Sequence, residues 1–274
     1  MVGITHGHEA GWAALPGARS LLRRVGDSVD ALTYLGEYFR VRLARALSPD
    51  AAARMVRLRP GVDTALYKPG AGGSAIREKL GLGQRPVVVC VSRLVARKGQ
   101  DALIRAWPQV RSACATAGAS PVLLVVGSGP AEARLRRLVV RYAVAQSVVF
   151  VGDVPAEVQP AYYDAGDVFA MPCRSCGLEV EGLGIVYLEA AATGLPVLTG
   201  DSGGAPDAVR DGETGYVVPG GDVSALAERL VHLLSNPAVA REMGDKGRAW
   251  MEQEWRWDLA VGRLKTAFDH VSTD

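Results

Sequence analysis

From Pro86 onward, short apolar runs alternate with longer amphipathic segments, and this alternation limits the possible fold more than any other feature. The apolar runs have the length of buried strands, and the segments between them are long enough for helices. We predict strands at 86–92, 122–127, 148–152, 168–172 and 196–200, with helices at 100–113, 131–142, 155–165 and 185–193. This order indicates a doubly wound parallel sheet of the α/β class.

Polar and glycine-rich turns follow the predicted strands. They lie at residues 92–93, 127–129, 152–153, 173–181 and 202–204. Ligands of doubly wound sheets bind beyond the carboxyl ends of the strands. We therefore expect these turns to converge on one binding crevice.

The segment 179–206, EVEGLGIVYLEAAATGLPVLTGDSGGAP, carries two glutamates, Glu181 in a predicted loop and Glu189 on a predicted helix. With a rise of about 1.5 Å per residue, their carboxylates lie on the order of 12 Å apart, close to the span of a nucleotide sugar from hexose to ribose. Gly182 and Gly184 leave bare amides at the helix start, which favours a diphosphate. The alternative is that two glutamates occur at this spacing by chance.

Arg93 and Lys98 follow the first strand of the alternating region. An arginine fork and a lysine charge can neutralise a leaving pyrophosphate without a metal ion, so we predict that they bind the diphosphate. The alternative is a solvated basic turn. Asp164 and Asp167 are interpreted as a helix end and a strand entry, and not as magnesium ligands.

The first 60 residues have a separate character. Met1–Thr5 is an apolar stretch followed by His6, which could hydrogen-bond a substrate hydroxyl or lie in a surface turn. Residues 29–34 are expected to form a buried strand. An apolar helix face follows, opposite several arginines, and is predicted to be core or to lie on an anionic bilayer. That face consists of Leu35, Phe39, Leu43 and Leu47.

Composition excludes some classes of protein. The net charge of +2 over 274 residues is too small to indicate nucleic acid binding. Residues 1–60 hold nine arginines against five acids, so an anionic partner is expected at that end. The N-terminus lacks a signal-peptide pattern and no segment has the length of a membrane span, so we expect a cytoplasmic protein that touches membranes only at their surface, the inner face of the plasma membrane.

The four cysteines are Cys90, Cys114, Cys173 and Cys176. A single CxxC pair without a neighbouring histidine falls short of a structural zinc site. We expect all four to be reduced and structural.

Several segments resemble family GT4 of retaining glycosyltransferases, which have the two-domain GT-B fold. These segments are SRLVARKGQDALIRAWPQV, VVGSGP, VEGLGIVYLEAAATGLPVLTGDSGGAPDAV and EWRWDLAVGRL. Within that family, HGHE, EGLGIVYLE and SGGAP are similar to actinobacterial mannosyltransferases that add the second mannose to phosphatidylinositol monomannoside. The resemblance implies transfer of mannose, with retention, from GDP-mannose to a phosphatidylinositol mannoside lipid.

The resemblance also implies roles for individual residues. Arg93 and Lys98 would hold the diphosphate, Glu181 would contact the mannose, and Glu189 the ribose. Backbone of Gly182, Leu183, Gly184 and Ile185 would meet the phosphates, backbone from Gly152 to Val154 the base, and His6 the sugar. The resemblance further implies that no metal or other cofactor is needed and that the leaving phosphate helps deprotonate the acceptor.

The domain organisation follows from the same comparison. We predict a remnant of the N-terminal, acceptor-side Rossmann-like domain at 1–60, a linker at 61–69, a complete C-terminal nucleotide-sugar-binding Rossmann-like domain at 70–253, and a helix packing back on the N-terminal part at 254–274. Pro- and Gly-punctuated linker character begins at Val56. Family members carry a whole first domain, so we expect a truncated chain with exposed apolar surface, weak donor binding and poor turnover.

Two other functions remain open at this point. A nucleotide-sugar epimerase of the same fold would yield an epimerised sugar without an acceptor. A non-catalytic donor-binding half would need a partner domain for transfer.

Overall fold

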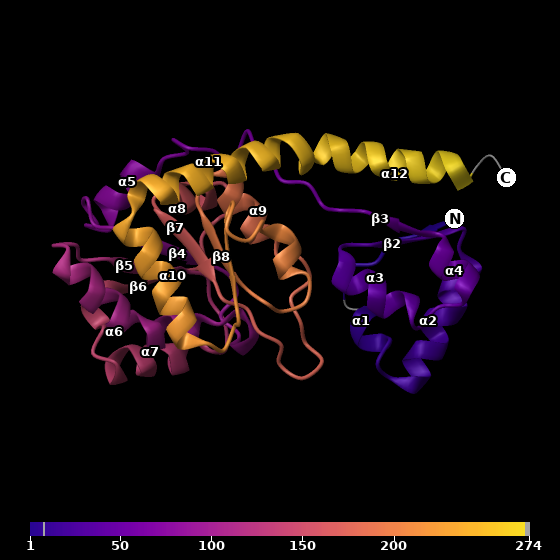
Figure 1. The fold of residues 1–274 in the computed structure, drawn as a ribbon, viewed down its shortest axis with the longest axis horizontal. Helices are drawn as coiled ribbons and strands as arrows, with labels where there is room; N and C mark the ends of the chain where they lie inside the picture. Colours follow the sequence, from indigo (N-terminus) through magenta and orange to yellow (C-terminus); the bar gives the residue numbers. More distant parts are fainter. Residues whose placement is uncertain (8, 272–274) are drawn as a thin grey trace.

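The computed structural model describes residues 1–7 and 9–271, and within them the strands form two parallel sheets, each with its own hydrophobic core (Figure 1). We call the six-stranded sheet with the helices of residues 73–254 the large lobe. The three-stranded sheet with the helices of residues 9–53 is the small lobe. The class is α/β, as the alternation of apolar runs predicts.

The large sheet has the order β6-β5-β4-β7-β8-β9, and all neighbouring strands are parallel. Its strands are β4 (Val87–Val91), β5 (Val122–Val126), β6 (Val148–Gly152), β7 (Val168–Met171), β8 (Val197–Gly200) and β9 (Gly215–Val218). Every residue of β4, β5, β7 and β8 is buried. Helices cover both faces of the sheet, which is why these strands are continuous apolar runs in the sequence.

The helices of the large lobe form two groups. One group packs together as α6 (Gln100–Thr116), α7 (Glu132–Arg141) and α10 (Val223–Ser235). The other contains α5 (Gly73–Lys79), α8 (Gln159–Asp164), α9 (Ile185–Ala192) and α11 (Pro237–Glu254). The crossover after β4 leads toward β5, and the crossover after β7 leads toward β8, in the opposite direction along the sheet. Because both crossovers are right-handed, α6 and α9 lie on opposite faces of the sheet.

Strands β4 and β7 lie at the centre of the sheet, and the chain adds later strands toward one edge after β4 and toward the other edge after β7. Strand β4 pairs with β5 on one side and with β7 on the other. The loops that leave the carboxyl ends of these two strands diverge toward opposite faces and open a crevice between them. The candidate site residues of the turns after β4 and β7 therefore meet here.

The small lobe has the strand order β1-β2-β3, also parallel. Its strands are β1 (Val2–Gly3), β2 (Ala31–Tyr34) and β3 (Met55–Arg57), and its helices are α1 (Glu9–Trp12), α2 (Pro16–Ser28), α3 (Glu37–Ala44) and α4 (Pro49–Ala53). Phe39, Leu43 and Leu47 are buried in its core, which confirms the core interpretation of the apolar helix face.

Two stretches of chain connect the lobes side by side. The amide of Val62 donates to the carbonyl of Trp255 at 2.7 Å, and Gly61 lies so close to Trp257 that a Cβ on the glycine would be 2.5 Å from the Cα of Trp257. Helix α12 (Trp257–Val271) then extends from the large lobe over the small one and contacts β1 (Figure 1). Both connections between the lobes therefore run through the same place, where residues 61–62 contact residues 255–257.

Several boundaries differ from the sequence predictions. Residues 56 and 57, expected in the linker, belong to strand β3. Helix α8 begins at Gln159 and not at 155, because a turn occupies the residues before it, and α6 continues past Pro108 to Thr116. Helix α5 was missed because its seven residues carry little periodicity. Strand β9 was missed because it begins at a glycine and has two half-buried residues, so it lacks the fully buried apolar run of its neighbours.

Candidate functional site

A compact ionic cluster occupies the crevice between the turns that follow β4 and β7. One carboxylate oxygen of Glu181, Oε2, lies 2.7 Å from Lys98 Nζ and 2.7 Å from Arg97 Nη1. Glu181 is only 5% exposed and Lys98 9%. Two cations on one buried carboxylate give the cluster a net positive charge, which suits it to an anionic ligand.

The backbone holds Lys98 in place through a close packing of two turns. Lys98 ends the short 3₁₀ helix η1 (Ala96–Lys98), and Gly99 follows with a φ of +78°. A Cβ at Gly99 would lie 2.0 Å from the carbonyl oxygen of Pro172, the residue after β7. Only a glycine lets the two turns approach this closely.

The tip of α9 lies in the same crevice. Helix α9 begins at Ile185, and its N-cap, Gly184, has a φ of +80° and supplies no side-chain cap. Leu183 is buried, while Ile185 is exposed. Uncapped amides and the helix dipole make such a tip suitable for phosphate groups. The start of α9 at Ile185 agrees with the helix predicted from the sequence, and the role of Gly182 to Ile185 at phosphates stays a prediction.

Glu189 lies one turn into α9, and its carboxylate faces the aromatic core. The hydroxyl of Tyr163 on α8 donates to Glu189 Oε2 at 2.6 Å. Burial raises the pKa of Glu189, and the hydrogen bond from Tyr163 opposes that shift in part. Glu189 is half-buried, so its predicted contact with a ribose would replace or share the bond to Tyr163.

His6 comes from the small lobe to the same crevice. Its carbonyl oxygen lies 3.8 Å from the position of a Cβ built on Gly182. The amides of His6 and Gly7 both donate to Glu9 Oε2, at 3.1 and 2.9 Å, and fix the turn after β1. The imidazole of His6 is exposed.

Arg93 is placed differently from its expected partner Lys98. Its side chain is exposed at the end of β4. Its carbonyl accepts from Gln100 Nε2 at 3.1 Å, and the same amide group donates to Ser92 at 2.8 Å, so the backbone of the turn is fixed. It is Arg97, and not Arg93, that joins Lys98 on Glu181. The role of Arg93 at a diphosphate stays a prediction.

The residues predicted to meet the base lie at the end of β6. The amide of Gly127 donates to the carbonyl of Gly152 at 2.8 Å, and the Ser128 hydroxyl donates to Asp153 at 2.5 Å. The two glycine-containing turns therefore pack together, and Val154 follows them, half-buried.

Sequence reasoning missed two residues at this crevice. Arg97 stands next to Lys98 in the chain, and this adjacency was the one available signal. Asp207 lies in η3 (Ala205–Ala208), far along the chain, and reaches residues of the small lobe, where its carboxylate accepts from the amide of Glu37 at 3.2 Å. Nothing in the pattern around Asp207 indicates this contact.

A second buried carboxylate, Asp101, also pairs with cations, with Arg174 at 2.7 Å and with Arg105 and Arg134 at 3.4 and 3.8 Å. All four cysteines are free, and burial raises the pKa of Cys90 to about 12. Among the side chains that the structure describes, no three His, Cys, Asp or Glu residues are grouped as metal ligands. Among the helices of the described part of the chain, none is both long and apolar enough to cross a bilayer.

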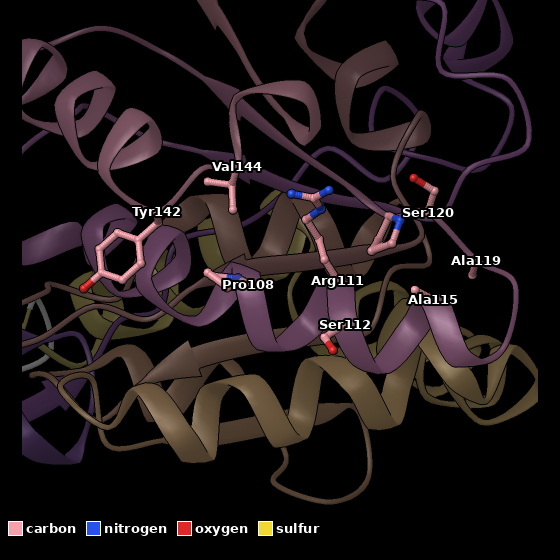
Figure 2. Close-up of a pocket in the computed structure, with 9 residues that line it drawn as sticks. Pro108, Arg111, Ser112, Ala115, Ala119, Ser120, Tyr142 and Val144 are labelled. Atoms are coloured by element: carbon pink, nitrogen blue, oxygen red, sulfur yellow. The ribbon is translucent and has the colours of Figure 1, made fainter.

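A pocket with a volume of about 350 Å³ lies beside α6, and its lining residues are drawn in Figure 2. It is lined by Pro108 and Arg111 of α6, by Ser120 before β5, and by Tyr142 and Val144 before β6. These residues precede strands, so the pocket lies at the amino ends of the sheet. It is on the edge opposite the Glu181 cluster.

Comparisons with known proteins agree on the family. Residues 74–250 match the family model of the glycosyl transferases group 1. The GDP-mannose-dependent alpha-(1-6)-phosphatidylinositol monomannoside mannosyltransferase of Mycolicibacterium smegmatis is 49% identical over 267 residues, covering 96% of this chain and 68% of the relative. A GDP-mannose-dependent monoacylated alpha-(1-6)-phosphatidylinositol monomannoside mannosyltransferase of Corynebacterium glutamicum is 46% identical over 269 residues, covering 96% and 68%.

Solved structures show the same architecture. Sucrose-phosphate synthase from Thermosynechococcus elongatus has a TM-score of 0.84 at 26% identity, over 99% of this chain and 68% of that one. Anabaena HepE in complex with UDP and glucose has a TM-score of 0.82 at 22% identity, over 100% and 71%.

The two parallel sheets, with a crevice at the carboxyl ends of the larger one, thus define a glycosyltransferase of the GT-B fold. The chain belongs to the glycosyl transferases group 1 family, as its match over residues 74–250 and its identity to the mycobacterial relative show.

Proposed function

We propose that this protein transfers a mannosyl residue from GDP-mannose to a phosphatidylinositol mannoside lipid, with retention of configuration. Relatives at 46–49% identity carry names that state GDP-mannose dependence and a phosphatidylinositol monomannoside acceptor. The single observation on this chain that carries the proposal is the Glu181–Lys98–Arg97 cluster beside the uncapped tip of α9.

Each part of GDP-mannose would have its own binding group in the crevice. The amides at the tip of α9, together with Lys98 and Arg93, would bind the diphosphate, and the carboxylate of Glu181 would accept hydrogen bonds from mannose hydroxyls. Glu189 would bind the ribose, and backbone from Gly152 to Val154 the base. Each anionic or hydroxylated part of GDP-mannose then has a partner of opposite hydrogen-bonding character.

The chemistry would be electrostatic. Negative charge develops on the diphosphate as its bond to the mannose breaks, and cations fixed in a partly buried crevice stabilise that charge more than water does. The leaving phosphate would take the acceptor proton, with His6 placed at the sugar. We propose that these cations make a metal ion unnecessary, so that transfer should survive chelation with EDTA.

The acceptor side would lie at a membrane surface. On α2, the apolar side chains of Leu21 and Val25 are 54% and 40% exposed, and the arginines of the same helix are exposed too. Exposed apolar residues among arginines suit the boundary of an anionic bilayer, such as the inner face of the plasma membrane.

The test offers radiolabelled GDP-mannose or UDP-glucose to the protein with phosphatidylinositol mannoside in anionic vesicles, with and without EDTA. We expect a mannolipid to form with GDP-mannose and no labelled lipid to form with UDP-glucose. NMR of the product should show the α-linkage that retention requires. Labelled lipid from UDP-glucose would contradict the donor. An epimerised sugar formed without lipid would favour the isomerase, and transfer that requires an added partner domain would favour a donor-binding half.

A further inference from the structure

The carboxylate of Asp207 crosses from the large lobe to the small one. Its Oδ2 accepts from the amide of Glu37, the first residue of α3, at 3.2 Å, and its Oδ1 lies 3.7 Å from Arg57 Nη2 at the end of β3. Figure 1 shows α3 on the side of the small lobe that faces the large lobe. Asp207 therefore contacts two elements of the other lobe with one side chain.

Helix α3 depends on Asp207 for its cap. Its own N-cap residue is Gly36, which offers no side chain, in an extended conformation with a φ of −158°. A Cβ at Gly36 would lie 1.8 Å from Asp207 Oδ2. The glycine thus leaves room for a carboxylate from the other lobe to take the place that an N-cap side chain normally fills.

The capped helix is linked to the candidate donor site by direct packing. Phe39, on the first turn of α3, is fully buried, and a Cβ at Gly204 would lie 2.9 Å from its ring. The amide of Gly204 donates to the carbonyl of Glu181 at 3.1 Å. Val180, next to Glu181, packs against the core of the small lobe. The loop that carries Glu181 is therefore held by both lobes.

We propose that Asp207 is a positioning residue that latches the two lobes together across the crevice and so places Glu181 against the turn of His6. The latch holds the two lobes in the arrangement of this structure. Its effect on mannosyl transfer rests on the proposed function. Among the described residues, the Asp207 side chain makes no hydrogen bond or ion pair with Lys98 or with the tip of α9, so it acts through α3 and not on the donor itself.

The latch predicts a change in the distance between the lobes. Spin labels at Ser20→Cys on α2 and Ala133→Cys on α7, in a Cys176→Ser background, report that distance by pulsed electron paramagnetic resonance. We expect one narrow distribution in the parent protein. Asp207→Ala should move the balance toward separated lobes by on the order of tenfold, because a helix cap and an ion pair are lost together.

A second variant removes the latch and leaves Asp207 in place. Gly36→Ala adds a methyl group where the carboxylate lies, and extended backbone accepts alanine without strain, so the separation of the lobes should match that of Asp207→Ala. Asp245→Ala, an exposed acid on α11, makes the same charge change and should leave the distribution unaltered. Unchanged distances in both Asp207→Ala and Gly36→Ala, with native circular dichroism, would overturn the latch.

Transfer kinetics then test the positioning role. GDP affinity should stay within about threefold in Asp207→Ala, because the predicted donor contacts lie on the large lobe, while kcat for mannosyl transfer should fall on the order of tenfold. Asp207→Asn keeps an acceptor for the Glu37 amide and should restore part of the rate. Equal loss of GDP binding and kcat would contradict positioning. A parent protein that transfers nothing would refute the proposed function, and the distance measurement would still decide the latch.

Discussion

The carboxylate of Glu181 and the ammonium group of Lys98 are joined at 2.7 Å although they follow different strands, β7 and β4. Strand β4 pairs directly with β7 in parallel. From β4 the chain adds strands toward one edge of the sheet, and from β7 it adds them toward the other edge. The pair therefore marks the place where the topology opens the crevice, and Arg97 joins it from the side of Lys98.

Removal of the carboxylate should destabilise the fold as well as the site. Glu181→Ala leaves Lys98 and Arg97 without their shared counter-charge in a buried place, and we expect the free energy of unfolding to fall by about 3 kcal/mol. Urea denaturation measures this. Glu179→Ala, two residues away and exposed, is the matched control and should change stability by no more than about 0.5 kcal/mol. Equal effects of the two variants would show that the cluster contributes nothing.

Arg93 should matter for binding and not for stability. Its side chain is exposed, so Arg93→Ala should leave the melting temperature unchanged, while the loss of a charge-assisted hydrogen bond should weaken GDP about tenfold or more. Isothermal titration calorimetry measures the affinity, with Arg141→Ala on α7 as an exposed control of the same charge. If Arg97→Ala alone weakens GDP, then Arg97 and not Arg93 is the diphosphate ligand.

The raised pKa of Glu189 should make the stability of the fold depend on pH. Burial raises its pKa above the ordinary value of 4.5, so the folded protein keeps this proton to higher pH than the unfolded chain does. The stabilising contribution of the protonated group is complete below pH 4.5 and is lost as the pH rises through the elevated pKa.

Glu189→Gln should therefore be more stable than the parent protein at neutral pH, and the gain should vanish below pH 4.5. Urea midpoints measured across this range test the prediction. Glu179→Gln serves as the control. A stability difference that does not vary with pH would show that Glu189 ionises freely in the folded protein. The same variant should weaken GDP binding if Glu189 holds the ribose.

Gly99 should tolerate no side chain. Gly99→Ala combines a left-handed backbone, with a φ of +78°, and a Cβ 2.0 Å from the carbonyl oxygen of Pro172. Gly83 has a φ of +55° and open space around the Cβ position, so Gly83→Ala isolates the backbone cost of about 1–2 kcal/mol. We expect a clearly larger loss for Gly99→Ala in thermal melts, together with weakened GDP binding as Lys98 is displaced. Equal losses would mean that the two turns can move apart.

Much of the large lobe could be predicted from the sequence. Continuous apolar runs such as Val87–Val91 and Val122–Val126 indicate strands that are covered on both faces, and alternation with helices implies a parallel sheet. The contact of Glu189 with Tyr163 and the capping of α3 by Asp207 could not be predicted, because each joins residues far apart in the chain. No local pattern encodes such a contact.

The class of fold, the glycine turns and the polar residues at the carboxyl ends of strands can be inferred from the sequence, because periodicity and turn chemistry are local properties. Which cation meets Glu181, and the contact of Asp207 with the small lobe, depend on how distant segments pack. Arg93 and Arg97 lie four residues apart in one turn and are equivalent as charges. The packing of Gly99 against Pro172 selects Arg97 and Lys98, since it sets the direction in which that turn presents its side chains.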